Sequence, residues 1–131
     1  MTRSSSNGAI TARPRSSASL KSGRLVEFSA EQVGRTIADG LRVRKLGYAP
    51  FEHVLAFVDD IVAVSEDEIL EAMRRLALRV RLAVEPSGAV PFAAHLFHRD
   101  ELPDTRINVA VVSGGNVEPH LLAEVLADAP E

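Results

Sequence analysis

Residues 61–69, Ile-Val-Ala-Val-Ser-Glu-Asp-Glu-Ile, carry the clearest structural signal in the chain. The first four residues are apolar and mostly β-branched, which is typical of a buried strand. Ser65 and Glu68 then form the Ser-x-x-Glu pattern of a capping box, and acidic residues in this first turn suit the positive end of a helix dipole. The stretch therefore predicts a strand over 61–64 that leads directly into a helix running to about Arg81.

The rest of the chain alternates between strand and helix patterns. The predicted helix has one apolar face, formed by Ile69, Met73, Leu76 and Val80. The other predicted elements are a short strand or extended segment at 25–28, a turn at 38–40 in which Gly40 is free to take a positive φ, a helix at 51–58, a buried helix at 89–97, a polar loop at 99–106, a buried strand at 107–112 and a helix at 120–127. This order predicts an α/β fold, a parallel sheet with flanking helices.

Composition limits the protein to one domain. The chain has 131 residues, 46% of them hydrophobic, and no cysteine, which excludes disulfides and thiolate metal ligands. Residues 1–24 contain seven serines, five basic residues and no acid, and are predicted to be poorly ordered. The same composition is also that of a mitochondrial transit peptide. A cytoplasmic protein is expected, with a mitochondrial location as the alternative.

Charge and histidine placement argue against several kinds of partner. Residues 1–50 hold nine Lys or Arg against three acids, and residues 51–131 hold six against fifteen. Because the basic residues are scattered and no binding motif accompanies them, no nucleic-acid partner is expected. No apolar run approaches the roughly 18 residues of a membrane span, so no membrane partner is expected either. The four histidines lack a recognisable metal-ligand spacing, so no metal site is predicted.

The sharpest candidate for a binding site is Val111–Asn116, Val-Val-Ser-Gly-Gly-Asn. A buried strand that ends here would place the Ser113 hydroxyl at the carboxyl edge of the sheet, where open α/β folds bind ligands. The two glycines would allow a ligand to approach the backbone closely. Taken alone, the motif fits a tight turn without a ligand equally well.

Two further motifs contain polar groups that a site would need. In Glu85–Ala89, Glu-Pro-Ser-Gly-Ala, Glu85 follows an apolar triplet and is a candidate buried carboxylate, while Ser87 is a candidate helix cap. The alternative is an ordinary helix start. Thr36–Leu41, Thr-Ile-Ala-Asp-Gly-Leu, is by itself only a turn.

Considered together and in order, these motifs resemble a known family. The series is Thr36–Leu41, Val58–Val62, Val64–Ile69, Val84–Ala89 and Val112–Val117. It closely resembles the C-terminal part of the threonine dehydratase/serine racemase family, which are fold-type II pyridoxal-phosphate enzymes, like the tryptophan synthase β-subunit. The resemblance covers residues 34–128, within a partial enzyme domain that spans 25–131.

The resemblance implies pyridoxal 5′-phosphate as the cofactor and assigns roles to four residues. Ser113 matches the serine that hydrogen-bonds the pyridine nitrogen, and Gly114 of the same motif is placed with it in the cofactor site. Glu85 matches a glutamate near the cofactor ring, and Gly40 matches a glycine whose backbone lines the ring edge. A hydroxyl partner leaves the nitrogen essentially unprotonated, which favours β-elimination over transamination.

The family's other working parts have no match in this sequence. Its Schiff-base lysine lies in a Ser-x-Lys-x-Arg context, and neither Lys21 nor Lys45, the two lysines here, has that context. The glycine-rich loop for the cofactor phosphate also has no match, and no carboxylate lies between Gly8 and Pro14, where the family's metal site would fall. No catalytic residue is therefore assigned, and the chain is expected to be a C-terminal fragment that is inactive alone.

The function implied by the resemblance is deamination of L-threonine or L-serine to a 2-oxo acid and ammonia. A non-catalytic remnant or complementing subunit is the first alternative, and serine racemase-like activity in the intact parent is the second. The expected partners are an amino acid substrate and either further copies of the chain or an N-terminal half.

Overall fold

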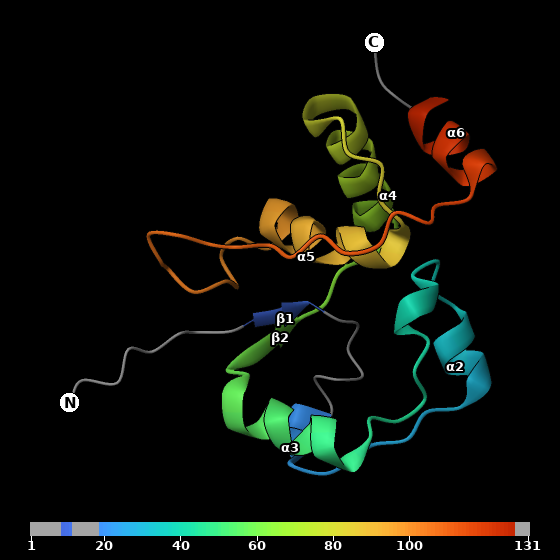
Figure 1. Cartoon of the computed structure of the whole chain (residues 1–131). Helices are drawn as coiled ribbons and strands as arrows, with labels where there is room; N and C mark the ends of the chain where they lie inside the picture. Colours follow the sequence, from blue (N-terminus) through green and yellow to red (C-terminus); the bar gives the residue numbers. More distant parts are fainter. Residues whose placement is uncertain (1–8, 12–18, 128–131) are drawn as a thin grey trace.

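The computed structural model describes residues 9–11 and 19–127. Figure 1 shows its helices grouped on both sides of a short sheet. The elements in chain order are β1 (Ala9–Thr11), α2 (Ala30–Gly34), a 3-10 turn (Asp39–Leu41), α3 (Tyr48–Phe57), β2 (Asp60–Val62), α4 (Glu66–Arg75), a π-helical turn (Leu76–Val80), α5 (Pro86–Phe97) and α6 (Pro119–Ala127). The Ser/Arg-rich segment predicted to be poorly ordered lies largely outside the described residues, which include its β1 portion and a helical turn at 19–22.

The junction of β2 and α4 forms as its sequence predicts. β2 pairs in parallel with β1, with Ile61 opposite Ile10. The capping box is complete: the Glu68 backbone N–H donates to Ser65 Oγ at 3.3 Å, and the Ser65 N–H donates to the Glu68 carboxylate at 2.7 Å. Both bonds satisfy backbone donors that the first helical turn leaves without intrahelical partners, so α4 starts at a defined residue.

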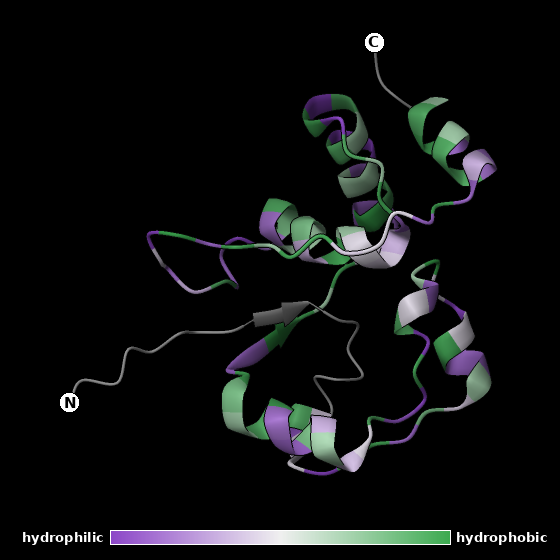
Figure 2. Ribbon diagram, viewed as in Figure 1, coloured by the Kyte–Doolittle hydropathy of each residue, from purple (hydrophilic) through white to green (hydrophobic). Residues whose placement is uncertain are grey.

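The hydrophobic core lies mainly between α4 and α5, which pack against each other (Figure 1). Ile69, Met73 and Leu76 of the predicted apolar face are buried as expected. They meet small residues on α5, which let the two helix backbones approach closely: Ala89, Val90, Ala93 and Ala94. In Figure 2 the first turn of α5 is pale and green segments follow along the rest of the helix. This core fixes the start of α5 relative to the end of β2.

Val80 does not belong to that apolar face, and in this respect the prediction is wrong. The helix changes to a π-helical turn over Leu76–Val80. Arg81, the residue that follows this turn, adopts a left-handed conformation with φ 63°. This change of helical periodicity rotates Val80 away from the core, where its exposed fraction is 57%.

The predicted buried strand at 107–112 is also absent. Within the described residues the sheet contains only β1 and β2, and residues 107–112 form an extended segment without a strand partner. Ile107, Val109 and Val111 are 70%, 82% and 70% exposed, while Val112 packs against the core cluster. The backbone of this segment is extended as in a strand, but no neighbouring strand in the described part of the chain accepts its backbone hydrogen bonds.

The remaining predictions differ in detail. The helices predicted at 51–58, 89–97 and 120–127 are confirmed as α3, α5 and α6; α3 and α5 begin three residues earlier than expected, and α6 begins one residue earlier. α5 starts earlier because Pro86 occupies its first turn, where a missing N–H has no cost. Residues 25–28 belong to no helix or strand, and the Phe28 N–H donates to the Arg44 carbonyl at 2.9 Å. The turn predicted at 38–40 is found as the 3-10 turn, and Gly40 does not adopt the positive φ that is open to it. None of the described helices is long and apolar enough to cross a membrane.

His98 connects the end of α5 to the start of α4. Its Nδ1 lies 2.6 Å from Glu101 Oε1, and its Nε2 lies 3.0 Å from Glu68 Oε1. Hydrogen bonds to Glu101 and Glu68 raise the pKa of His98 above its ordinary value, although partial burial opposes the rise. Burial raises the pKa of Glu68, but hydrogen bonds from Ser65 and His98 outweigh it, so that pKa is lowered. The folded protein therefore favours a charged pair.

These directions predict a pH-dependent stability. A raised histidine pKa stabilises the fold below the unfolded value of about 6.5, and this contribution is lost as the pH rises through the folded pKa. His98→Gln should therefore lower the free energy of unfolding by about 1 kcal/mol at pH 6 and by much less at pH 9. Urea unfolding at both pH values measures this. His120→Gln is the control, since His120 is 70% exposed in its pair with Glu118. Equal losses for His98→Gln at both pH values would contradict the prediction.

Candidate functional site

The Ser-Gly-Gly motif and the Glu-Pro-Ser-Gly motif lie directly against each other. A Cβ atom placed on Gly88, in the first turn of α5, would overlap the backbone carbonyl of Ser113. Only glycine permits this approach, because the atom it avoids belongs to the backbone and cannot turn aside. Gly88 therefore fixes Ser113 beside the start of α5.

Gly114 faces the carboxyl group of Glu85. Its φ is +74°, a conformation that side chains rarely adopt, and a Cβ at this position would overlap the Glu85 carboxyl group. Glu85 is the N-cap residue of α5, where the helix dipole favours an anion. Its side chain makes no capping hydrogen bond, and within residues 19–127 it has no ion-pair partner. The carboxylate is half-buried and remains available to a ligand.

Gly40 is held near the start of α5 by a hydrogen bond to Ser87. The Gly40 N–H donates to Ser87 Oγ at 3.0 Å, although the two residues are 47 positions apart in sequence. Ser87 was predicted as a helix cap, and this is wrong: Glu85 is the N-cap and Pro86 precedes Ser87 within the helix. With the capping position taken, the Ser87 hydroxyl contacts the Asp39–Leu41 turn instead. All four residues predicted to form the site thus gather at the start of α5.

A cleft of about 500 Å³ opens beside this cluster. Gly40 and Glu85 line it, whereas Ser113 and Gly114 are exposed and do not, although Gly114 lies against the Glu85 carboxyl group. Its other polar lining residues were not predicted from the sequence: Asp39, Arg42, Asn116 and Glu118. The Arg42 guanidinium donates two hydrogen bonds to the Thr36 carbonyl, at 2.9 and 3.1 Å. A charged side chain on a surface turn does not by itself predict a binding site, because most such residues face only solvent.

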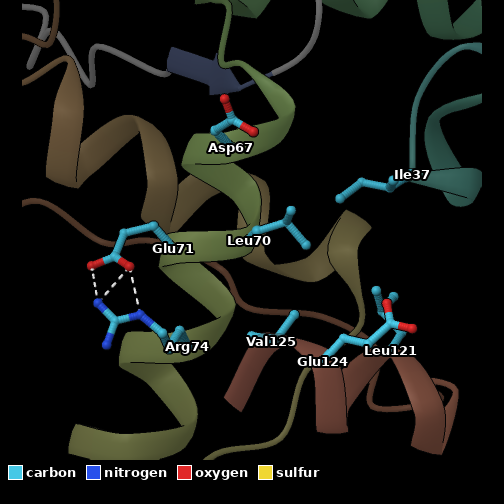
Figure 3. A pocket seen from close by; sticks show the side chains of 8 residues that line it. All are labelled: Ile37, Asp67, Leu70, Glu71, Arg74, Leu121, Glu124 and Val125. Carbon is cyan, nitrogen blue, oxygen red and sulfur yellow. Dashed lines mark hydrogen bonds and ion pairs between the residues drawn. The ribbon is translucent and has the colours of Figure 1, made fainter. Parts of the chain in front are cut away.

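A second cavity, of about 450 Å³, lies between α4 and α6 and is shown in Figure 3. Ile37, Leu70, Leu121 and Val125 give it a largely aliphatic lining. At its edge Glu71 and Arg74 form an ion pair, with a hydrogen bond of 2.6 Å, and so satisfy each other (Figure 3). None of the motif residues Glu85, Ser113 and Gly114 borders this cavity, so we place the candidate site in the cleft at the start of α5.

No metal centre is apparent in this region. Among the described residues, no group of three or more His, Asp or Glu side chains is arranged to hold a metal ion.

Comparison with known proteins identifies the family. The profile described as "Pyridoxal-phosphate dependent enzyme" matches residues 7–114. The chain belongs to this family. The range matched by the profile begins upstream of residue 34, where the motif resemblance starts. The resemblance to threonine dehydratases and serine racemases is confirmed by individual relatives. Serine racemase of Schizosaccharomyces pombe is 34% identical over 83% of the chain and 32% of its own length. L-threonine ammonia-lyase of Geobacter sulfurreducens is 37% identical over 88% of the chain and 28% of its own length.

A solved structure agrees with the sequence relatives. The crystal structure of a threonine deaminase from T.th. is 39% identical in sequence, with a TM-score of 0.76, over 84% of this chain and 40% of that chain. The predicted fold class, part of a fold-type II pyridoxal-phosphate enzyme, is thereby confirmed. The chain spans about a third of the length of the curated relatives it matches.

The contact between Gly88 and Ser113 predicts a steep penalty for any side chain at Gly88. Gly88→Ala should lower the free energy of unfolding by about 3 kcal/mol or more, because backbone must move to admit the methyl group. Gly34→Ala is the matched control, since Gly34 lies in α2 and a Cβ added there would meet nothing within 4 Å. Urea unfolding of both variants measures the difference. Comparable effects at the two glycines would contradict the close packing described.

Proposed function

We propose that this chain forms the wall that holds the cofactor ring in a pyridoxal-phosphate-dependent ammonia-lyase acting on L-threonine or L-serine. The single observation that supports this most strongly is the convergence of Gly40, Glu85 and Gly114 at the start of α5. Three segments distant in sequence meet there, and each presents backbone or a carboxylate rather than a bulky side chain. Such a surface suits a flat polar ring.

The cleft fits the ring of the cofactor and not its phosphate. Asp39, Glu85 and Glu118 line it, against a single guanidinium, that of Arg42. Because three carboxylates and one cation give a negative potential, a phosphate dianion would be repelled. A neutral pyridine ring carries no such penalty, and the lack of a Cβ at Gly114 leaves room for close approach. The phosphate would then be held by residues outside this cleft.

Each residue would have a distinct role. When bound, the cofactor withdraws electrons from the substrate's α-carbon, which makes loss of the β-hydroxyl group possible. The Ser113 hydroxyl would donate to the pyridine nitrogen and leave it unprotonated. The Gly40 backbone would line the ring edge, and Glu85 would place a hydrogen-bond acceptor near the ring. These assignments extend family roles to matching positions and rest on the proximity described above.

The catalytic lysine would come from elsewhere. Lys45 lies 5.6 Å from the ring centroid of Tyr48, next to α3 and away from the start of α5. Neither Lys45 nor Lys21 has the sequence context of the family's attachment lysine. Activity would therefore require a lysine from another polypeptide segment, and the expected partners include an N-terminal half.

One observation favours a second candidate function, that of a non-catalytic or complementing subunit. Ile107, Val109 and Val111 present an exposed apolar face on an extended segment. A neighbouring polypeptide would bury this face. A racemase activity is the remaining alternative, since one relative is a serine racemase. Product analysis separates the activities, because a lyase releases a 2-oxo acid from L-threonine or L-serine and a racemase yields D-serine.

The negative cleft gives a direct test of the proposal. Pyridoxine and pyridoxine 5′-phosphate are suitable probes because they lack the aldehyde that reacts with lysines. We expect pyridoxine to bind the purified chain at least as tightly as its phosphate, as measured by titration calorimetry. Ser113→Ala should weaken pyridoxine binding about tenfold through loss of one hydrogen bond.

The control is Ser29→Ala, which removes a capping-box hydroxyl at the start of α2 from a residue that does not line the cleft. This variant should bind pyridoxine as the unmodified chain does. Absence of saturable pyridoxine binding would refute the proposal, and much tighter binding of the phosphate would refute the division between ring and phosphate.

A further inference from the structure

Ser87 has an unusual position for a serine near a helix start. It lies one residue beyond Pro86 within α5, so its hydroxyl does not cap the helix. The hydroxyl instead accepts a hydrogen bond from the Gly40 N–H at 3.0 Å and lies 3.4 Å from Asp39 Oδ1, to which it can donate. Both of its partners belong to the Asp39–Leu41 turn, so one hydroxyl connects two segments that are distant in the chain.

The segment that contains this turn is anchored at two points. At one end the Ile37 N–H donates to the Glu66 carboxylate of α4 at 2.8 Å. At the other end Ser87 holds Gly40 against α5. The contact is also close, because a Cβ on Gly40 would lie 3.0 Å from Ser87 Oγ, tighter than most Cβ contacts, and Ser87 would have to shift to admit it. The second anchor therefore combines a hydrogen bond with close packing.

The second anchor also determines the geometry of the cleft. Gly40, in the Asp39–Leu41 turn, and Glu85, two residues before Ser87, both line the cleft. A shift of the turn relative to α5 would change the separation of these two lining residues. Asp39 cannot replace Ser87 in this role. Its carboxylate also accepts from the Gly40 N–H, at 2.8 Å, but it belongs to the same turn and would move with it.

We propose that Ser87 is a positioning residue for the cleft: its hydroxyl ties the Asp39–Leu41 turn to the first turn of α5 and sets the spacing between Gly40 and Glu85. What the cleft is positioned to bind rests on the proposed function, whereas the tie itself does not. Ser87 touches neither the reacting atoms nor, in this account, the cofactor.

The test compares Ser87→Ala with Ser87→Thr, which keeps the hydroxyl, and with Ser29→Ala, which removes a capping-box hydroxyl at the start of α2. Amide hydrogen exchange measured by NMR reports the tie, and pyridoxine affinity measured by calorimetry reports the cleft. In Ser87→Ala we expect exchange at Gly40 and Leu41 to accelerate about tenfold and pyridoxine affinity to fall by a similar factor. Ser87→Thr should restore both, and Ser29→Ala should lower the urea midpoint while changing neither.

The two readouts separate the possible failures. Unchanged exchange at Gly40 in Ser87→Ala would overturn the tie. Faster exchange with unchanged pyridoxine affinity would overturn the positioning role while leaving the tie intact. If the unmodified chain does not bind pyridoxine, the proposed function fails, and the exchange measurement still decides whether Ser87 holds the turn.

Discussion

The approach of the Ser113 carbonyl to Gly88 is the constraint on which the candidate site depends. Two stretches of backbone meet at the start of α5 with no room for a side chain between them. That contact puts Gly114 against the Glu85 carboxyl group, and the neighbouring Ser87 brings in Gly40. The apolar core between α4 and α5 holds α5 in place. This packing therefore keeps the site at the start of α5 rigid.

Electrostatics determines what such a site can hold. Carboxylates dominate the cleft, and its one guanidinium is already engaged by the Thr36 carbonyl. The proposal that the cleft holds a neutral ring, and not a phosphate, rests on this balance of charge. This agrees with a sequence that matches the family's ring-contacting motifs but contains no glycine-rich phosphate loop. The chain spans about a third of the length of these curated relatives.

Local signals were predicted well from the sequence, and long-range ones less so. The capping box at Ser65 and the apolar face of α4 depend on residues within a few positions of one another, and both are found. The strand predicted at 107–112 depended on neighbours that the described chain does not supply. The hydrogen bond between Ser87 and Gly40 joins segments 47 residues apart, and no local pattern indicates it. The motif resemblance selected residues that lie together at the start of α5, because the order of the motifs along the chain carries information that single motifs lack.

The most direct test of the central claim is an NMR titration of the labelled chain with pyridoxine, following the backbone amides. Binding at the start of α5 predicts that the largest shifts occur at Gly40, Glu85, Ser113 and Gly114. Shifts confined to the aliphatic cavity between α4 and α6, or no saturable shifts at all, would contradict the assignment of this cleft as the place where the cofactor ring is held.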